Sequence, residues 1–92
     1  MMSGPMSPEN AEILALEGLG WLASDAQGLH QFLNLSGLDP AALRQEAGNR
    51  DLGAAVLDFL LGHEELLLQF CESAGVVPKD LHVARLSLGG AA

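Results

Sequence analysis

Residues that favour β-strands are scarce in this 92-residue sequence. Thr and Tyr are absent, Ile occurs once, and aromatic residues make up only 4% of the chain. Apolar residues nevertheless account for 49% of the sequence, and most of them are Leu and Ala, which favour helices. The composition therefore predicts an all-α fold, and the length allows a single hydrophobic core.

Basic residues are few and scattered. Arg44, Arg50, Lys79 and Arg85 stand against twelve Asp and Glu residues, which gives a net charge of −8. Nucleic acids and anionic lipid surfaces repel such a chain, and four dispersed cations cannot form the basic stripe that nucleic-acid binding requires. We therefore predict no nucleic-acid partner and no membrane, whereas a basic protein partner fits the charge.

Signals for export and membrane insertion are also missing. The longest apolar runs are four residues, whereas a membrane-spanning helix needs about 20. Residues 1–7 lack the cationic start and the apolar core of a secretory signal. The single cysteine, Cys71, cannot form a disulfide within the chain. These observations predict a cytoplasmic protein.

Capping residues divide the chain into six predicted helices. Ser7 and Asp39 each place an N-cap side chain before a proline, and Gly37 and Gly75 follow apolar stripes as C-terminal glycines. The predicted helices cover about 8–23, 26–36, 40–47, 51–61, 64–74 and 78–88. They form one compact bundle over residues 8–88, after a disordered tail at 1–7 and before a frayed end at 89–92.

Two helices have distinctive sequences. Gly18 and Gly20 lie inside the first predicted helix, where each costs up to about 1 kcal/mol relative to Ala. We expect another helix to approach closely at these glycines. The fourth predicted helix has the fullest apolar stripe and should lie at the centre of the core. Its stripe consists of Leu52, Ala55, Val56, Phe59 and Leu60.

The chain resembles itself when the sequence is shifted by 38 positions. Nine of the 30 positions from Leu14 to Leu43 are then matched by an identical residue, against about 3 expected by chance. The identities include the turn residues Gly37 and Pro40, and Trp21 aligns with Phe59. We interpret this as two three-helix units packed about a pseudo-two-fold axis. The alternative is that capping chemistry makes unrelated helix turns look alike.

The second unit carries more apolar residues than the first. These extra side chains lie within its three predicted helices, and two interpretations stay open. Either these helices occupy the middle of the bundle and are buried on several sides, or the side chains form an exposed surface for a partner. The candidate partner surface consists of Leu61, Leu66, Leu68, Val83 and Leu86.

Few polar side chains are spaced for chemistry. His30, His63 and His82 fall in three different predicted helices or caps, without the spacing that preorganises a metal site. Glu64 and Glu65 begin a helix, where carboxylates favour the helix dipole. We predict no catalytic residue, no metal and no cofactor.

Three further side chains have a structural and a functional interpretation. Cys71 shares a predicted helix face with Phe70, so we expect a buried thiol and not a nucleophile. Asp58 is expected to face water and not to act as a buried base. Trp21 is expected to pack in the core, because it aligns with Phe59, and not to line a binding site.

Three segments carry a resemblance to a known family. They are FLNLSGLDPAALR at 32–44, VLDFLL at 56–61 and EELL at 64–67. With them the chain resembles, from about Glu9 onward, a family of short alphaproteobacterial proteins described only as a domain of unknown function. The resemblance implies an independent cytoplasmic helical protein without assigned activity, cofactor or catalytic residues. Val77 departs from the repeat, because an Asp there would repeat the Asp39 cap, and this predicts a weaker start of the sixth helix.

The sequence thus predicts a non-enzymatic protein–protein interaction module that binds an unknown protein or a second copy of itself. Two alternatives remain. In one, His30, His63 or His82 holds a metal or a small ligand together with Glu64 or Glu65. In the other, the acidic surface mimics nucleic acid and occupies the basic groove of another protein.

Overall fold

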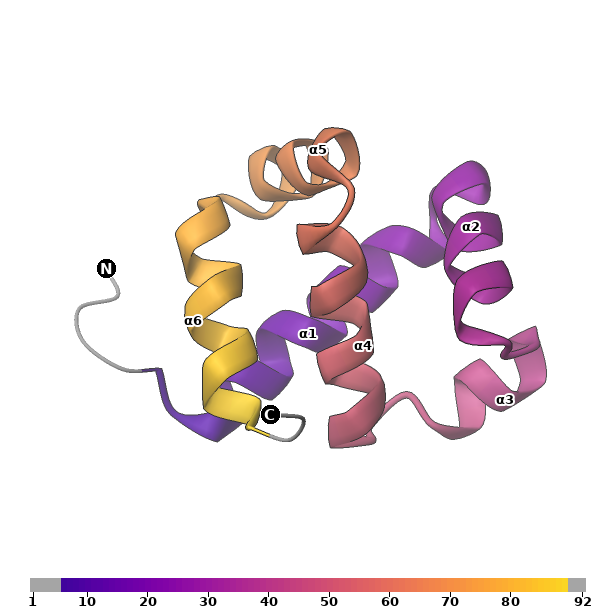
Figure 1. Ribbon diagram of the computed structural model, residues 1–92, viewed down its shortest axis with the longest axis horizontal. Coiled ribbons are helices and arrows are strands. Elements are labelled where there is room, and N and C mark those ends of the chain that lie inside the picture. The colour runs from indigo at the N-terminus through magenta and orange to yellow at the C-terminus, as the bar shows by residue number, and fades with distance from the viewer. Residues whose placement is uncertain (1–5, 90–92) are drawn as a thin grey trace.

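Six helices make up the regular structure. The computed structural model describes residues 6–89, and within this range the chain contains no strand. The helices are α1 (Pro8–Ala23), α2 (Ala26–Ser36), α3 (Pro40–Gln45), α4 (Arg50–Leu61), α5 (Glu64–Ala74) and α6 (Pro78–Leu88) (Figure 1). The all-α prediction is therefore confirmed. The largest difference from the predicted boundaries is in α3, which ends at Gln45 and not near residue 47.

Side-chain caps fix several helix starts. Ser7 Oγ accepts a hydrogen bond from the Asn10 backbone N–H at 3.1 Å, and Asp39 Oδ1 accepts one from Ala42 at 2.7 Å. Asn49 Oδ1 likewise accepts from Asp51 at 2.7 Å. These bonds satisfy backbone donors that have no partner within the helix.

The starts of α2 and α6 differ from those of the capped helices. The sequence predicts Asp25 as the cap of α2, and Asp25 does stand at the N-cap, but its side chain makes no capping hydrogen bond. Val77 cannot cap α6, yet the helix still starts at Pro78, because Asp80 Oδ2 accepts a hydrogen bond from the Val77 N–H at 3.1 Å. Gly37 and Gly75 end α2 and α5 in the left-handed conformation, with φ of 76° and 73°.

The core lies between α1, α4 and α6. Helix α6 packs against both α1 and α4, which also pack on each other, while α2 and α5 lie at the ends of this group (Figure 1). Helix α3 sits at the edge of the molecule and packs little against the other helices. The largest fully buried side chains are Phe32, Phe70, Leu22, Leu57, Leu60, Leu81 and Val56.

The two glycines of α1 behave differently. A Cβ at Gly18 would lie 3.2 Å from Leu60 Cδ1, so α4 approaches α1 closely there, as predicted. At Gly20 the prediction is wrong, because this residue is exposed and no atom lies within 4 Å of the position of a Cβ.

The predicted pseudo-two-fold packing is not confirmed. Helices α2 and α5 coincide when the chain is shifted by the repeat spacing, and α3 and α6 both begin at a proline. The third helices then differ, because α6 packs extensively on α1 and α4 whereas α3 packs little on other helices. The duplication therefore stays a prediction.

The segment before α1 differs from the predicted disordered tail where it is described. Met6 is buried, with 5% of its surface exposed, and its carbonyl oxygen accepts a hydrogen bond from Ser87 Oγ at 2.6 Å. Residues 1–5 lie outside the described residues, as do residues 90–92 of the predicted frayed end. Gly89 is described, and its carbonyl accepts a hydrogen bond from Arg85 Nη1.

Across residues 6–89, none of the helices combines the length and the apolar character needed to cross a membrane.

Candidate functional site

The predicted partner surface divides into two groups. Leu61, Leu66 and Val83 are half-buried and pack against the core. Leu68 of α5 and Leu86 of α6 are exposed, at 51% and 81%. Part of the extra apolar bulk of the second half therefore completes the core, and only two of the five residues are open to solvent.

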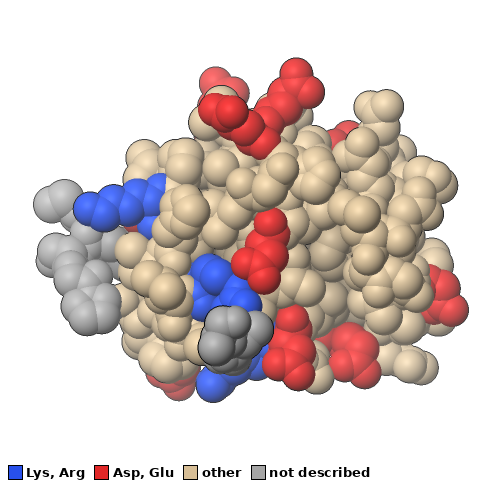
Figure 2. All heavy atoms as spheres, viewed as in Figure 1, with Lys and Arg blue, Asp and Glu red and all other residues tan. Residues whose placement is uncertain are grey.

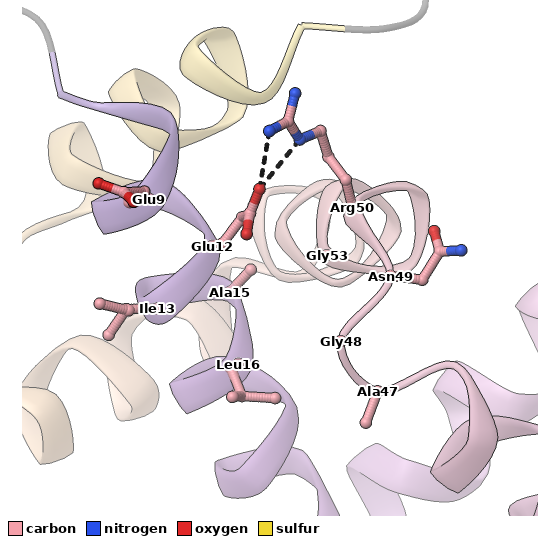
Figure 3. A pocket seen from close by; sticks show the side chains of 10 residues that line it. All are labelled: Glu9, Glu12, Ile13, Ala15, Leu16, Ala47, Gly48, Asn49, Arg50 and Gly53. Atoms are coloured by element: carbon pink, nitrogen blue, oxygen red, sulfur yellow. Dashed lines mark hydrogen bonds and ion pairs between the residues drawn. The ribbon is translucent and has the colours of Figure 1, made fainter.

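A groove beside α1 brings exposed apolar residues together. Ile13 and Leu16, one helical turn apart on α1, are 57% and 51% exposed. They line a groove of 280 Å³ whose opposite side includes Ala47 and Gly48 of the α3–α4 connection and Gly53 of α4 (Figure 3). This concave site has an apolar floor that large side chains could fill.

An ion pair closes one end of the groove. The guanidinium of Arg50 meets Glu12 Oε2 through Nη2 at 2.9 Å and through Nε at 3.0 Å, which links the first turn of α4 to α1 (Figure 3). The two side chains are 54% and 40% exposed. A pair this exposed adds little stability, at most about 1 kcal/mol, so its side chains can rearrange when a ligand binds.

The surroundings of the groove are acidic. Glu9 lies on the rim, and Glu17, Glu46 and Asp51 are exposed close to it along the chain. Arg50 is the one cation among the groove residues, and its charge is already paired with Glu12. On the face seen in Figure 2, the part over α2 and α3 shows only acidic charges. The electrostatic field near the groove therefore favours positively charged ligands.

Sequence reasoning missed this groove. Helix α1 carries apolar side chains around most of its circumference, so the pattern does not say which of them face solvent. Our prediction looked for surplus apolar residues in the second half, whereas the exposed pair that lines a groove lies in the first. The available signal was Ile13 and Leu16, which lie outside the buried stripe formed by Leu14, Leu19 and Leu22.

A second hollow, of 360 Å³, is lined by one of the three candidate histidines, His63. Its other lining residues belong to α2 and α4. His63 Nδ1 lies 2.7 Å from the Phe59 carbonyl oxygen, so this nitrogen carries the proton and donates it, and the imidazole lies 4.2 Å from the Phe59 ring. Asp58, which also lines the hollow, is exposed as predicted and pairs with Arg85 at 2.9 Å. His63 Nδ1 and Asp58 Oδ1 thus already have partners within the chain.

The three histidines do not meet. His30 and His82 are exposed on α2 and α6, whereas His63 precedes α5. Among the described residues, no three His, Cys, Asp or Glu side chains are grouped as metal ligands would be. Glu64 and Glu65 occupy the first turn of α5 and are exposed.

Cys71 and Trp21 are packed as predicted. Cys71 is 5% exposed, and burial, with a smaller contribution from the Asp80 charge, raises the pKa of its thiol above the ordinary value of 9.0. Trp21 packs against the core, with its ring 5.9 Å from that of Phe70. Neither residue lines the groove.

Comparison with known proteins gives a family without an assigned activity. No curated protein and no solved structure matches the chain. The family described as "Protein of unknown function (DUF3572)" matches residues 8–91, which include all six helices. The chain therefore belongs to the DUF3572 family of proteins of unknown function.

Proposed function

We propose that this protein is a non-enzymatic protein–protein interaction module and that the α1 groove is its binding site. The observation that carries the proposal is the pair Ile13 and Leu16, two exposed apolar side chains that line one concave surface. Exposed apolar side chains gathered in a groove are typical of binding sites, because their burial by a partner removes them from water.

The chemistry of the described residues supports a binding role. An activated cysteine needs a lowered pKa and an accessible position, whereas the Cys71 thiol is buried and its pKa is raised. A single buried cysteine also suits the reducing cytoplasm, which we propose as the location of the protein.

Site-specific photo-crosslinking in the native cells tests this proposal. A photo-crosslinking amino acid replaces Leu16 in the groove or, as the matched control, Leu68 on α5, which has the same 51% exposure. We expect a discrete adduct with a protein from position 16 and none from position 68. Absence of an adduct from position 16 would overturn the proposal, and an adduct only from position 68 would move the interface to the surface predicted from the sequence.

A further inference from the structure

Residues that are equivalent in the sequence repeat contact each other where α1 meets α4. These pairs are Glu12 with Arg50 at 2.9 Å, Ala15 with a Cβ placed on Gly53 at 3.1 Å, and Val56 Cγ1 with a Cβ placed on Gly18 at 3.3 Å. Each pair joins a residue to its own counterpart 38 positions later. Contacts between counterparts are expected for two helices that are related by a two-fold axis running between them.

The aromatic contacts show the same relation between counterparts 38 positions apart. The rings of Trp21 and Phe70 lie 5.9 Å apart, and those of Phe32 and Phe59 lie 5.3 Å apart. The repeat exchanges Trp21 with Phe59 and Phe32 with Phe70, so it maps one pair onto the other. The aromatic contacts thus agree with the predicted two-fold relation of α1 and α2 to α4 and α5.

The third helix of each half breaks this symmetry. Helix α6 lies on the side of α4 that carries Gly53 and Asp58: Leu88 Cδ1 is 3.7 Å from the Cβ position of Gly53, and Arg85 pairs with Asp58. The corresponding side of α1 carries residues 15 and 20, and α3 does not cover it as α6 covers α4. Gly20 is exposed there, as is the neighbouring Leu16.

The groove lies at this uncovered position. It is lined by residues 15 and 16 of α1 and by residues 50 and 53 of α4. The surface that α6 covers is likewise formed by α1 and α4. We infer that the groove binds a short amphipathic helix of a basic partner protein, placed across α1 and α4 as α6 is placed on the other side. This inference rests on the proposed function and adds the chemistry of the partner.

Charge selects a basic helix over a second copy of the chain. Two copies would each bring a net charge of −8, and Glu9, Glu17, Glu46 and Asp51 would add local repulsion at the groove. A helix with Lys or Arg beside its apolar stripe would instead meet these carboxylates. Helix α6 gives the precedent, because its apolar Leu88 and its basic Arg85 face α4 together.

A labelled peptide derived from α6 serves as the probe. It has the sequence of residues 77–89 with the exposed His82 and Leu86 replaced by Lys, so it keeps the buried stripe of Leu81, Ala84 and Leu88 and gains positive charge. The control peptide carries Glu at the same two positions. Binding to the full chain is measured by fluorescence anisotropy for the wild type, Leu16→Lys and the matched Leu68→Lys.

We expect saturable binding of the basic peptide to the wild type. Leu16→Lys should weaken it by at least about tenfold, because it places a charge in the apolar floor, whereas Leu68→Lys should leave it unchanged. The acidic peptide should bind at least about tenfold more weakly than the basic one. Leu16 and Leu68 are equally exposed, so both variants should fold, which circular dichroism verifies.

Two results would overturn the inference: no saturable binding of the basic peptide, or binding that Leu16→Lys does not weaken. If crosslinking from position 16 still captures a protein, the proposed function stands and only the basic helix is wrong. A crosslink between two copies of the chain would likewise leave the proposed interaction function standing and contradict the basic helix as the partner. If position 16 gives no adduct at all, the proposed function itself fails.

Discussion

Two glycines in helices test where the backbones of α1 and α4 touch. No atom lies within 4 Å of a Cβ at Gly20 of α1, whereas a Cβ at Gly53 of α4 would lie 3.1 Å from the Cβ of Ala15. Alanine at either position gains helix propensity, by up to about 1 kcal/mol. The two substitutions should therefore differ mainly in packing.

We expect Gly20→Ala to stabilise the protein and Gly53→Ala not to stabilise it. Gly20→Ala should raise the free energy of unfolding by about 0.5–1 kcal/mol. In Gly53→Ala the new methyl meets the Ala15 Cβ, which cannot rotate away, so α1 and α4 must move apart. Overpacking of this kind costs about 1–3 kcal/mol, which leaves a net change between about zero and a loss of about 2 kcal/mol.

Urea unfolding followed by circular dichroism measures both variants against the wild type. A change of 1 kcal/mol shifts the Tm of a domain of this size by roughly 4–8 °C, so thermal unfolding provides a second readout. If Gly53→Ala stabilises the protein as much as Gly20→Ala, the helices do not touch at Ala15. The predicted pseudo-two-fold packing would then lose one of the three contacts that support it.

Three further predictions concern the core, the thiol and an ion pair. Phe32→Ala should lower the free energy of unfolding by about 3–5 kcal/mol, because Phe32 is 2% exposed; a loss below about 1 kcal/mol in urea unfolding would contradict its place in the core. Cys71 should react slowly with a thiol reagent until urea unfolds the chain. Because the pKa of Cys71 is raised in the folded protein, the contribution of the buried neutral thiol to stability should be present below pH 9.0 and lost as the pH rises above this value. Unfolding curves of Cys71→Ala at alkaline pH should lack this loss of stability. Arg85→Ala should cost about 0.5–1 kcal/mol, since Asp58 is 58% exposed and stays hydrated without its partner, and a loss above about 2 kcal/mol would show that the pair is shielded from water.

Most of the fold could be predicted because the helix ends have local causes. A cap followed by proline at Ser7 and Asp39, and a left-handed glycine at Gly37 and Gly75, act within a few residues and need no knowledge of the tertiary structure. This is why the starts of α1 and α3 and the ends of α2 and α5 lie where the sequence predicts.

The surface could not be predicted in the same way, because exposure depends on which helix covers which face. Leu61 and Leu16 are both leucines on strongly apolar helices, yet Leu61 packs against the core and Leu16 is exposed in the groove. Met6 shows the same limit, since a residue in a predicted tail is buried in the core. The hydrogen bond that the Met6 carbonyl accepts comes from Ser87, at the other end of the sequence.

The opening beside α1 follows from a change in one apolar stripe. The inner face of α6 reads Leu81, Ala84 and Leu88, and all three side chains are buried. Their counterparts in the first half of the repeat are Leu43, Glu46 and Arg50, of which only Leu43 is buried. Burial of a charged side chain costs several kcal/mol unless it is paired, so this stripe disfavours a helix packed on α1 as α6 is packed on α4. These charged counterparts also give the groove its acidic neighbour Glu46 and the Arg50 that pairs with Glu12.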